Sequence, residues 1–534
     1  MHVEIVLLVL SLLFFASIFT DKIGYRFGVP ALLLFLGVGM LFGPEGIGLT
    51  TATAGLPSSI GKIQAVGTVC LCIILFSGGL DTKITDILPV VYPGITLASL
   101  GVFLTTIITG VVIWFIFGHV GALYSISLPV ALLIAATMSS TDSASVFSIL
   151  RTNRLGLKHN LRPLLELESG SNDPMAYILT ITLIAIVKNQ GGEISYLGII
   201  QNIFIQLVMG GVMGYGFGKV IVFLLRRVHL FNESLYPIMV LTACIFIFSA
   251  TYFLNGNPYL AVYIGGVVIG NHKFTRRRPT KSFFDGLTWL SQLVMFLMLG
   301  MMVSPSELLE WDVLVPCLVI SFVMLLLSRP ISVFLCMIPF KQYKMRDKIF
   351  LSWVGLKGAV PIFFAILCIA ESTPQSNLLF NVVFLCTIVS LIFQGTTLSS
   401  MAKLLHLDMI QKEKKRLVYF DIDLPDEIQS SASERIIDST MLQGGNLLKN
   451  LSLPEHTLVI MVRRGEDFFV PMGNSVLQEG DQILVITDYD AMETVRQKED
   501  DEKEERLWKE SLKRPLIKIR KGVRNSVSSV FHTK

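Results

Sequence analysis

The feature that most restricts the fold of this chain is a succession of apolar runs, each long enough to cross a lipid bilayer. The 534 residues are 52% hydrophobic and only 16% charged, and the runs continue from the N-terminus to about residue 404. Inside a bilayer every backbone N–H and C=O group needs a partner within the protein, so each run is expected to be an α-helix. The sequence therefore predicts an all-α polytopic membrane protein over residues 1–404.

We predict about thirteen spans, and charge sets their orientation. Lys and Arg gather in the loops that follow odd-numbered spans, for example in residues 151–162, 273–281 and 341–348. By the positive-inside rule the N-terminus is then outside and the C-terminus is cytoplasmic. The approximate spans are 3–20, 29–48, 62–80, 89–117, 124–150, 160–187, 196–225, 236–254, 258–271, 283–303, 313–338, 348–370 and 379–404.

Two of these spans are interrupted by residues that break helices. The fifth contains the polar run from Thr137 to Ser145, and the twelfth contains Gly355-Leu356-Lys357-Gly358-Ala359-Val360-Pro361. When the seventh span is set aside as a linker, the two breaks occupy matching positions in two six-helix repeats of opposite orientation. Interrupted helices at matching positions of inverted repeats predict a transporter site where the broken helices cross.

The sixth span carries two carboxylates and an amide at membrane depth, Glu168, Asn172 and Asp173. A charged side chain near the bilayer centre costs about 2.5–3.5 kcal/mol, so its presence indicates a function. At 100° per residue, Ser169 and Asp173 share one face of a helix, and Glu168 and Asn172 share another. One face can therefore offer oxygen ligands to a cation, while Glu168 needs a different partner.

Backbone oxygens add to the expected site. Pro174 has no N–H, so the carbonyl of Gly170 loses its helical donor. Thr141, in the break of the fifth span, offers a hydroxyl and a carbonyl group. Because desolvation disfavours a charged carboxylate, Asp173 is expected to carry either a proton or a monovalent cation, and the two loads compete for it.

Asp142 and Lys357 lie next to the expected helix breaks. Half-helix N-termini carry partial positive charge and C-termini partial negative charge, so Asp142 can neutralise the former and Lys357 the latter. Two interpretations of Asp142 stay open, dipole compensation and direct binding of the cation or proton. We expect Lys357 to form a structural ion pair with Glu168, since each is otherwise an unpaired charge in a low-dielectric medium. The sequence identifies no partner for Arg329 in the eleventh span.

After Leu404 the composition becomes polar. A basic cytoplasmic linker is expected at 405–417, a small α+β module at 418–492 and a charged cytoplasmic tail at 493–534. The tail is expected to be helical and then disordered, and no nucleic-acid-binding fold accompanies its basic residues. Within the module we predict three strands and a helix, at Thr457–Val462, Phe468–Val470, Gln482–Thr487 and Asp438–Leu448 respectively.

The membrane motifs together resemble the monovalent cation:proton antiporter family, in its NhaP-like branch. The resemblance implies a homodimer with a scaffold domain and a mobile core domain, in a bacterial-type inner membrane. It also implies that Asp173 carries the proton or the cation in turn, helped by Ser169 and Thr141. An Asn-Asp pair at 172–173 suggests electroneutral exchange. The family usually has arginine where this chain has Lys357. The matching segments are Thr141-Asp142, Glu168-Ser169, Asn172-Asp173-Pro174 and Gly355-Leu356-Lys357-Gly358-Ala359-Val360-Pro361.

The C-terminal module resembles the TrkA-C (RCK_C) type, the C-terminal half of potassium-conductance regulator domains. Relatives with such a module tend to be K⁺/H⁺ antiporters that sometimes also move Na⁺. No Gly-x-Gly-x-x-Gly motif precedes the module, so a complete nucleotide-binding regulator is not expected. Two interpretations stay open, a domain that binds a small nucleotide and a dimerising domain without ligand. No other cofactor is expected.

These observations lead us to expect a secondary active antiporter that exchanges a cytoplasmic monovalent cation for protons by alternating access, with K⁺ favoured and Na⁺ as a second candidate. A Na⁺/H⁺ antiporter of the same fold is the alternative within this class. A regulated cation channel is the alternative outside it, although a channel does not require matched broken helices. An enzyme is not expected, because neither a Ser-His pairing nor a metal-ligand cluster is recognisable within the predicted spans.

Overall fold

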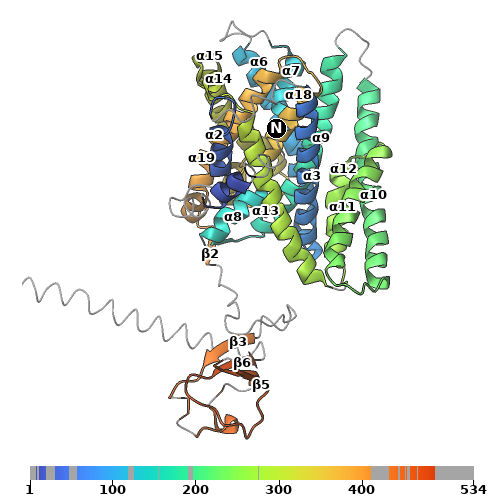
Figure 1. Ribbon diagram of the computed structural model, residues 1–534. Helices are drawn as coiled ribbons and strands as arrows, with labels where there is room; N and C mark the ends of the chain where they lie inside the picture. Colours follow the sequence, from blue (N-terminus) through green and yellow to red (C-terminus); the bar gives the residue numbers. More distant parts are fainter. Residues whose placement is uncertain are drawn as a thin grey trace, which may run out of the picture. The chain divides into compact units, whose positions relative to one another are not determined.

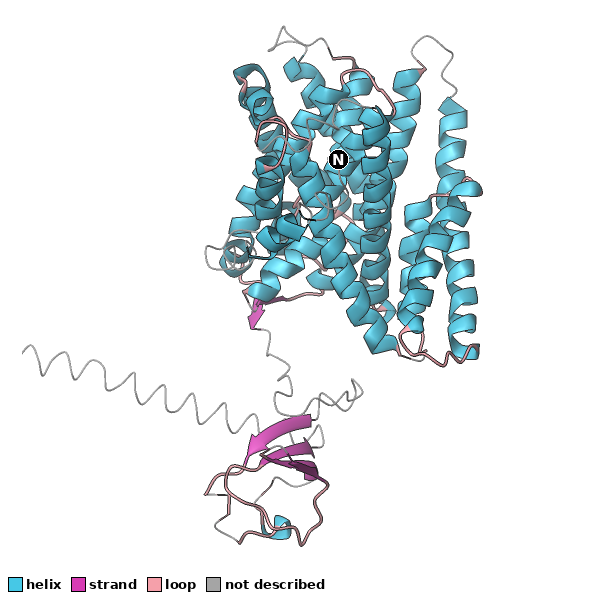
Figure 2. Cartoon of the chain, viewed as in Figure 1, coloured by secondary structure: helices cyan, strands magenta, loops and turns pink. Residues whose placement is uncertain are grey.

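The chain divides into two units, Met1–Gln411 and Lys412–Lys534. The first unit is helical and the second contains a small β-sheet, as Figures 1 and 2 show. The tail predicted at 493–534 and most of the predicted linker lie outside the described residues. The computed structural model describes residues 8, 11–19, 31–46, 57–117, 126–153, 155–189, 196–274, 276–410, 432–439, 441–442, 445–451, 453, 457–465 and 467–487.

Helices account for the membrane unit, and each of the predicted spans contains a helix in its described part. Among the described residues, eight helices are long and apolar enough to cross a membrane, and four further apolar helices are shorter. Residues 11–19 are helical. The labelled α-helices are α2 (Ala31–Leu41), α3 (Pro57–Asp81), α4 (Ile84–Ile87), α5 (Val91–Thr96), α6 (Val102–Phe115), α7 (Leu128–Thr137), α8 (Ser143–Thr152), α9 (Leu161–Lys188), α10 (Tyr196–Arg227), α11 (Leu235–Phe253), α12 (Pro258–Gly270), α13 (Arg277–Met301), α14 (Pro305–Leu309), α15 (Trp311–Val323), α16 (Arg329–Cys336), α17 (Met345–Trp353), α18 (Ala359–Ala370) and α19 (Ser376–Leu404).

The helix breaks predicted in the fifth and twelfth spans are present. The fifth span is divided into α7 and α8 by residues 138–142, and the twelfth into α17 and α18 by residues 354–358. The two non-helical segments contact each other, since the N–H of Asp142 donates to the carbonyl of Leu356 at 2.8 Å. Each break leaves two helix ends whose backbone groups lack intrahelical partners, so the crossing is a polar place inside an apolar bundle.

A second correspondence between the two halves comes from π-helical turns. The fourth span contains η2 (Leu97–Gly101) and the eleventh contains η4 (Met324–Ser328). Spans four and eleven occupy the same position in their halves, and η2 packs on α16 while η4 packs on α6. A π-helical turn is an insertion within an α-helix and is frequent at functional sites. Arg329 directly follows η4.

Packing sorts the membrane helices into two bundles. In the first, α12 packs on α3 and α10, and α13 packs on α2 and α3; we call α2, α3 and α10–α13 the α12 bundle. In the second, α9 packs on α7, α5 and η2, and α18 packs on α19; we call α4–α9 and α15–α19 the α9 bundle. Both helix breaks belong to the α9 bundle. The bundles meet mainly where α18 contacts α3 and α13 and where α9 contacts α12.

A short β-ladder ties the end of the membrane unit to the start of α9. β1 (Leu155–Leu157) pairs antiparallel with β2 (Asp408–Ile410), which follows α19. The N–H of Lys158 extends the ladder by donating to the carbonyl of Leu407 at 3.0 Å. The sequence does not predict this pairing, because three-residue strands carry too little periodicity to be recognised.

The C-terminal unit contains a four-stranded antiparallel sheet in the order β3-β6-β4-β5. Its strands are β3 (Ala432–Ile436), β4 (Thr457–Arg464), β5 (Asp467–Phe469) and β6 (Gln482–Thr487), so the three predicted strands are confirmed. The helix predicted at Asp438–Leu448 is wrong: the described residues there form turns, and a 3-10 turn starts at Leu448. Gly445 has φ +115°, a conformation that ends any helix at this point. The buried apolar core consists of Ile437, Leu451, Val459, Val462, Leu477, Ile483 and Val485.

Candidate functional site

The candidate site lies where α9 passes the break between α7 and α8. The four polar residues predicted on α9 are all buried: Glu168, Ser169, Asn172 and Asp173. Helix α9 continues through Pro174, whose ring removes one backbone donor within the helix. A buried carboxylate needs polar partners inside the protein, so the contacts of Asp173 define the site.

Asp173 is hydrogen-bonded by a residue that the sequence pattern alone does not single out. The hydroxyl of Ser140, in the break of the fifth span, donates to Oδ1 of Asp173. Ser140 is 1% exposed and Asp173 is 6% exposed. The signal for Ser140 is its position in the polar run before Thr141, but the run alone does not say which hydroxyl faces Asp173.

Thr141 contacts Ser169 and Asn172 of α9. Its carbonyl accepts the hydroxyl proton of Ser169 at 2.8 Å, and its hydroxyl oxygen accepts from Nδ2 of Asn172 at 2.6 Å. Ser169 in turn accepts from the N–H of Ser143 at 3.0 Å. The oxygens of Asp173, Ser169 and Thr141 predicted to bind the cation are therefore gathered around one break. Asn172 positions Thr141 with its amide, and its own Oδ1 has no hydrogen-bond partner among the described residues.

Asp142 caps a helix. Its Oδ1 accepts from the N–H of Ser145 at 3.1 Å, and its Oδ2 accepts from the hydroxyl of the same residue, which is the N-cap arrangement for α8. A Cβ atom at Gly358, which precedes α18, would overlap the Asp142 carboxylate. One carboxylate thus lies at the N-termini of both α8 and α18, where helix dipoles favour negative charge. This geometry supports the dipole-compensation interpretation of Asp142.

Lys357 lies at the opposite kind of helix end. Its Nζ donates to the carbonyl of Ser140 at 2.8 Å, close to the C-terminal end of α7, and its N–H donates to the hydroxyl of Ser390 at 2.9 Å. A charged donor at the C-terminus of a helix is favourable. Lys357 and Asp142 thus compensate helix ends of opposite polarity at the crossing. Lys357 also restrains Ser140, the residue that donates to Asp173.

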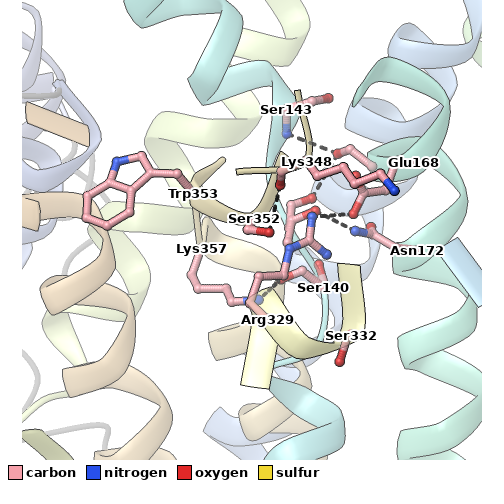
Figure 3. Close-up of polar contacts among 12 residues, drawn as sticks. Ser140, Ser143, Glu168, Asn172, Arg329, Ser332, Lys348, Ser352, Trp353 and Lys357 are labelled. Atoms are coloured by element: carbon pink, nitrogen blue, oxygen red, sulfur yellow. Dashed lines mark hydrogen bonds and ion pairs between the residues drawn. The ribbon is translucent and has the colours of Figure 1, made fainter. Parts of the chain in front are cut away.

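The partner predicted for Glu168 differs from the partner in the structure. Glu168 Oε1 pairs with the guanidinium of Arg329, with side chains 2% and 5% exposed respectively, and Lys357 bonds the Ser140 carbonyl instead (Figure 3). The reason is topological: α16, which begins at Arg329, packs on η2, and η2 packs on α9. Lys357 instead lies in the break of the twelfth span, next to the end of α7. Both cations need a compensating partner, and the sequence alone does not assign them.

A small cavity adjoins these charges. Polar residues that line it include Arg329, Lys357, Ser390 and Gln394. Arg329 Nε and Glu168 Oε2 have no hydrogen-bond partner among the described residues. The part of the chain that the structure describes contains no group of three or more His, Cys, Asp or Glu side chains able to hold a metal ion. The oxygen set at Asp173 suits a monovalent cation, which takes hydroxyl, carbonyl and carboxylate oxygens.

Comparisons with known proteins identify the family of the membrane unit and of the C-terminal unit. Residues 9–404 match the family described as sodium/hydrogen exchanger, transmembrane, and residues 445–499 match the TrkA-C domain. A K⁺/H⁺ antiporter NhaP of Alkalimonas amylolytica is 36% identical over 493 residues, which cover 91% of this chain and 81% of that protein. A K⁺/H⁺ antiporter NhaP2 of Shewanella oneidensis is 34% identical over 486 residues, with the same coverage.

Two further similarities concern sodium transporters. A Na⁺/H⁺ antiporter NhaH of Halobacillus aidingensis is 28% identical over 333 residues, 58% of this chain and 75% of that protein. The structure of the sodium proton antiporter MjNhaP1 from Methanocaldococcus jannaschii at pH 8 superposes with a TM-score of 0.60 and 22% identity, and covers 74% of this chain and 100% of that one. At this identity the structural match shows the common fold alone.

Proposed function

Because the chain belongs to the transmembrane sodium/hydrogen exchanger family, we propose that it exchanges cytoplasmic K⁺ for H⁺, one for one, at Asp173. The observation that carries the proposal is the position of the Asp173 carboxylate. It is buried at the break between α7 and α8 and accepts a hydrogen bond from Ser140 there. Oxygens of Ser169 and Thr141 surround the same break.

The mechanism is competition between two loads. A proton neutralises Asp173 directly, and a monovalent cation neutralises it through the oxygens of Asp173, Ser169 and Thr141. An unloaded carboxylate is a buried charge, so its passage across the membrane is disfavoured and exchange is coupled. The loaded site changes sides when the α9 bundle, which carries both helix breaks, moves against the α12 bundle.

Charge assignment in the site supports electroneutral exchange. Asp142 is engaged as a helix cap and Glu168 is paired with Arg329, which leaves Asp173 as the acidic group of the α9 face that faces the break. Asn172 contributes an amide in place of a second carboxylate. One carboxylate that loads either one proton or one monovalent cation moves no net charge per cycle.

The choice of K⁺ rests on relatives. Those with 34–36% identity over 91% of this chain are named K⁺/H⁺ antiporters. Na⁺ is the second candidate cation, supported by the NhaH relative and by the common fold with a sodium proton antiporter. Site geometry does not by itself separate the two ions, because they differ in the number and distance of the oxygens they bind.

The remaining expectations about the assembly belong to this proposal. The exchange unit occupies 1–404, the linker 405–417, the regulatory domain 418–492 and the cytoplasmic tail 493–534. The protein works as a homodimer in a bacterial-type inner membrane, with the N-terminus outside, the C-terminus in the cytoplasm and a role in pH homeostasis. The TrkA-C domain regulates exchange, either by binding a small nucleotide or by dimerising, and no other cofactor is required.

The direct test uses full-length protein in liposomes that contain a pH-sensitive dye and a set proton gradient. K⁺, Na⁺ and Li⁺ are added separately, with and without a clamped membrane potential. Proton movement driven by K⁺ and indifferent to the clamp is the expected result. A response to Na⁺ or Li⁺ alone contradicts the choice of cation, and a response that depends on the clamp contradicts electroneutrality. No response to any of the three contradicts the exchanger function.

Ser140 provides a sharper test of the site itself. Removing its hydroxyl by Ser140→Ala takes a donor from Asp173, and hydrogen bonds to charged groups contribute about 1.5–3 kcal/mol. The proton then competes better, so the half-saturating K⁺ concentration is expected to rise roughly ten-fold or more. Ser139→Ala is the matched control, because the Ser139 hydroxyl donates to the carbonyl of Ala136 and does not reach the site. Equal behaviour of the two variants contradicts this role of Ser140.

A further inference from the structure

Beside Asp173, the two bundles meet along the contact between α9 and α12. Elsewhere most packing is within each bundle. Helix α12 lies on α3 and α10 (Figure 1), whereas α9 lies on α7 and η2. Any movement of the α9 bundle against the α12 bundle must therefore remake the α9–α12 contacts. Polar groups in this contact have the largest influence on the equilibrium between positions, because a buried polar group without a partner is costly.

Asn257 joins the two helices by a hydrogen bond. Its Nδ2 donates to the carbonyl of Pro174, the residue that follows Asp173, at 2.9 Å. Its Oδ1 accepts from the N–H groups of Tyr259 and Leu260 and caps α12. The side chain is fully buried. Capping requires only an acceptor, which serine or aspartate also supplies, so the amide donor toward α9 is what asparagine adds.

Tyr263, further along α12, presents an unused donor to α9. Its hydroxyl is buried and has no hydrogen-bond partner among the described residues. The ring and hydroxyl lie against Gly170, where a Cβ atom would overlap them. Since Pro174 has no N–H, the carbonyl of Gly170 lacks its helical donor. The Tyr263 hydroxyl is thus a donor without an acceptor among the described residues, and the Gly170 carbonyl is an acceptor without its helical donor. Both groups belong to the same part of the α9–α12 contact.

We propose that Asn257 and Tyr263 are positioning residues that form a latch, holding α9 in two alternative positions against α12. In the position that the structure shows, Asn257 donates to the carbonyl of Pro174, and the Tyr263 hydroxyl has no hydrogen-bond partner among the described residues. In the position that opens the site to the other face, Tyr263 donates to the carbonyl of Gly170 and the Asn257 contact is broken. The two bonds bias the equilibrium between the faces in opposite directions. This inference rests on the proposed alternating-access exchange.

The test compares cation affinity at the two faces of the membrane, with full-length protein inserted in one orientation in liposomes. The half-saturating K⁺ concentration at a face varies inversely with the fraction of protein open to that face, so the ratio between faces reports the equilibrium. Asn257→Ser keeps the cap and loses the donor, and is expected to change the ratio by roughly two- to twelve-fold, the effect of one net hydrogen bond. Tyr263→Phe is expected to change it in the opposite direction.

Tyr236→Phe is the matched control, because this buried tyrosine on α11 donates its hydroxyl to the carbonyl of Val228. Its ratio is expected to equal that of the unaltered protein. Should Asn257→Ser fail to fold, Asn257→Thr also caps the helix without the amide donor and carries the same expectation.

Opposite shifts in the two variants support the latch. An unchanged ratio in either variant, shifts in the same direction, or a fall in maximal rate without a change of ratio overturns it. If the unaltered protein exchanges neither K⁺, Na⁺ nor Li⁺ for protons, the proposed function fails and the latch falls with it. A functional exchanger with unshifted variants refutes the latch alone.

Discussion

Removing the positive member of the buried ion pair, by Arg329→Gln, is expected to destabilise the membrane unit strongly. Glu168 would remain with its side chain 2% exposed and its Oε2 already without a hydrogen-bond partner among the described residues. Breaking a buried pair by removing one partner costs about 3–5 kcal/mol, because it leaves an uncompensated charge. Lys357→Gln leaves the pair intact and removes the charged bond to the Ser140 carbonyl, a loss of about 1.5–3 kcal/mol.

A double-mutant cycle turns this comparison into a measurement. The free energy of unfolding is determined in mixed micelles of mild and denaturing detergent for each single variant and for two double variants. Glu168→Gln with Arg329→Gln removes both charges, so it is expected to be at least about 2 kcal/mol more stable than the sum of the single effects. Glu168→Gln with Lys357→Gln is expected to show a smaller coupling. Equal coupling of Glu168 to both cations would refute the pairing of Glu168 with Arg329.

Two further predictions concern other parts of the chain. Gly358→Ala places a Cβ atom against the Asp142 carboxylate. Such overpacking is expected to lower the free energy of unfolding of the membrane unit by about 1–3 kcal/mol in the same assay. An unchanged free energy of unfolding would contradict tight packing at the crossing. In the C-terminal sheet, burial alone would raise the pKa of Asp481, but hydrogen bonds from Arg464 and the charge of that residue hold the pKa below its usual value. Its stabilising effect is thus present above the unfolded pKa of about 4 and is lost as pH falls through the lower folded value. The protection factors of the β6 amides in the full-length protein, which are the ratios of the intrinsic exchange rate at each pH to the observed rate, are expected to fall over that acid range. They are expected to fall less in Arg464→Gln; identical profiles would contradict the role of this pair.

The helical architecture is predictable because apolar runs of this length leave the backbone no alternative in a bilayer. The two breaks are predictable as well, since glycine, proline and polar residues interrupt two spans at matching positions. Helical periodicity also places Ser169 and Asp173 on one face of α9. These features are local or repeat-based, so they are encoded in short stretches of sequence.

The features that the sequence does not predict depend on contacts between distant segments. Arg329 and Lys357 are both cations in need of a partner. The packing of α16 on η2, and of η2 on α9, assigns Arg329 to Glu168. Ser140 is one of several hydroxyls in its run, and its direction toward Asp173 comes from the crossing geometry. Asn257 has the sequence context of an ordinary helix cap. In the C-terminal unit, the helix expected at Asp438–Leu448 is wrong because turn residues outweigh the apolar spacing.

The pH dependence of K⁺ affinity tests the central claim, competition between proton and cation at Asp173, most directly. Exchange is driven by a K⁺ gradient in liposomes at equal pH on both sides, over a series of pH values. Competition predicts that the half-saturating K⁺ concentration rises up to about ten-fold for each unit of acidification, at constant maximal rate, and that Asp173→Asn folds and inserts but does not exchange. A half-saturating concentration that stays constant while the maximal rate falls, or normal exchange by Asp173→Asn, would contradict it.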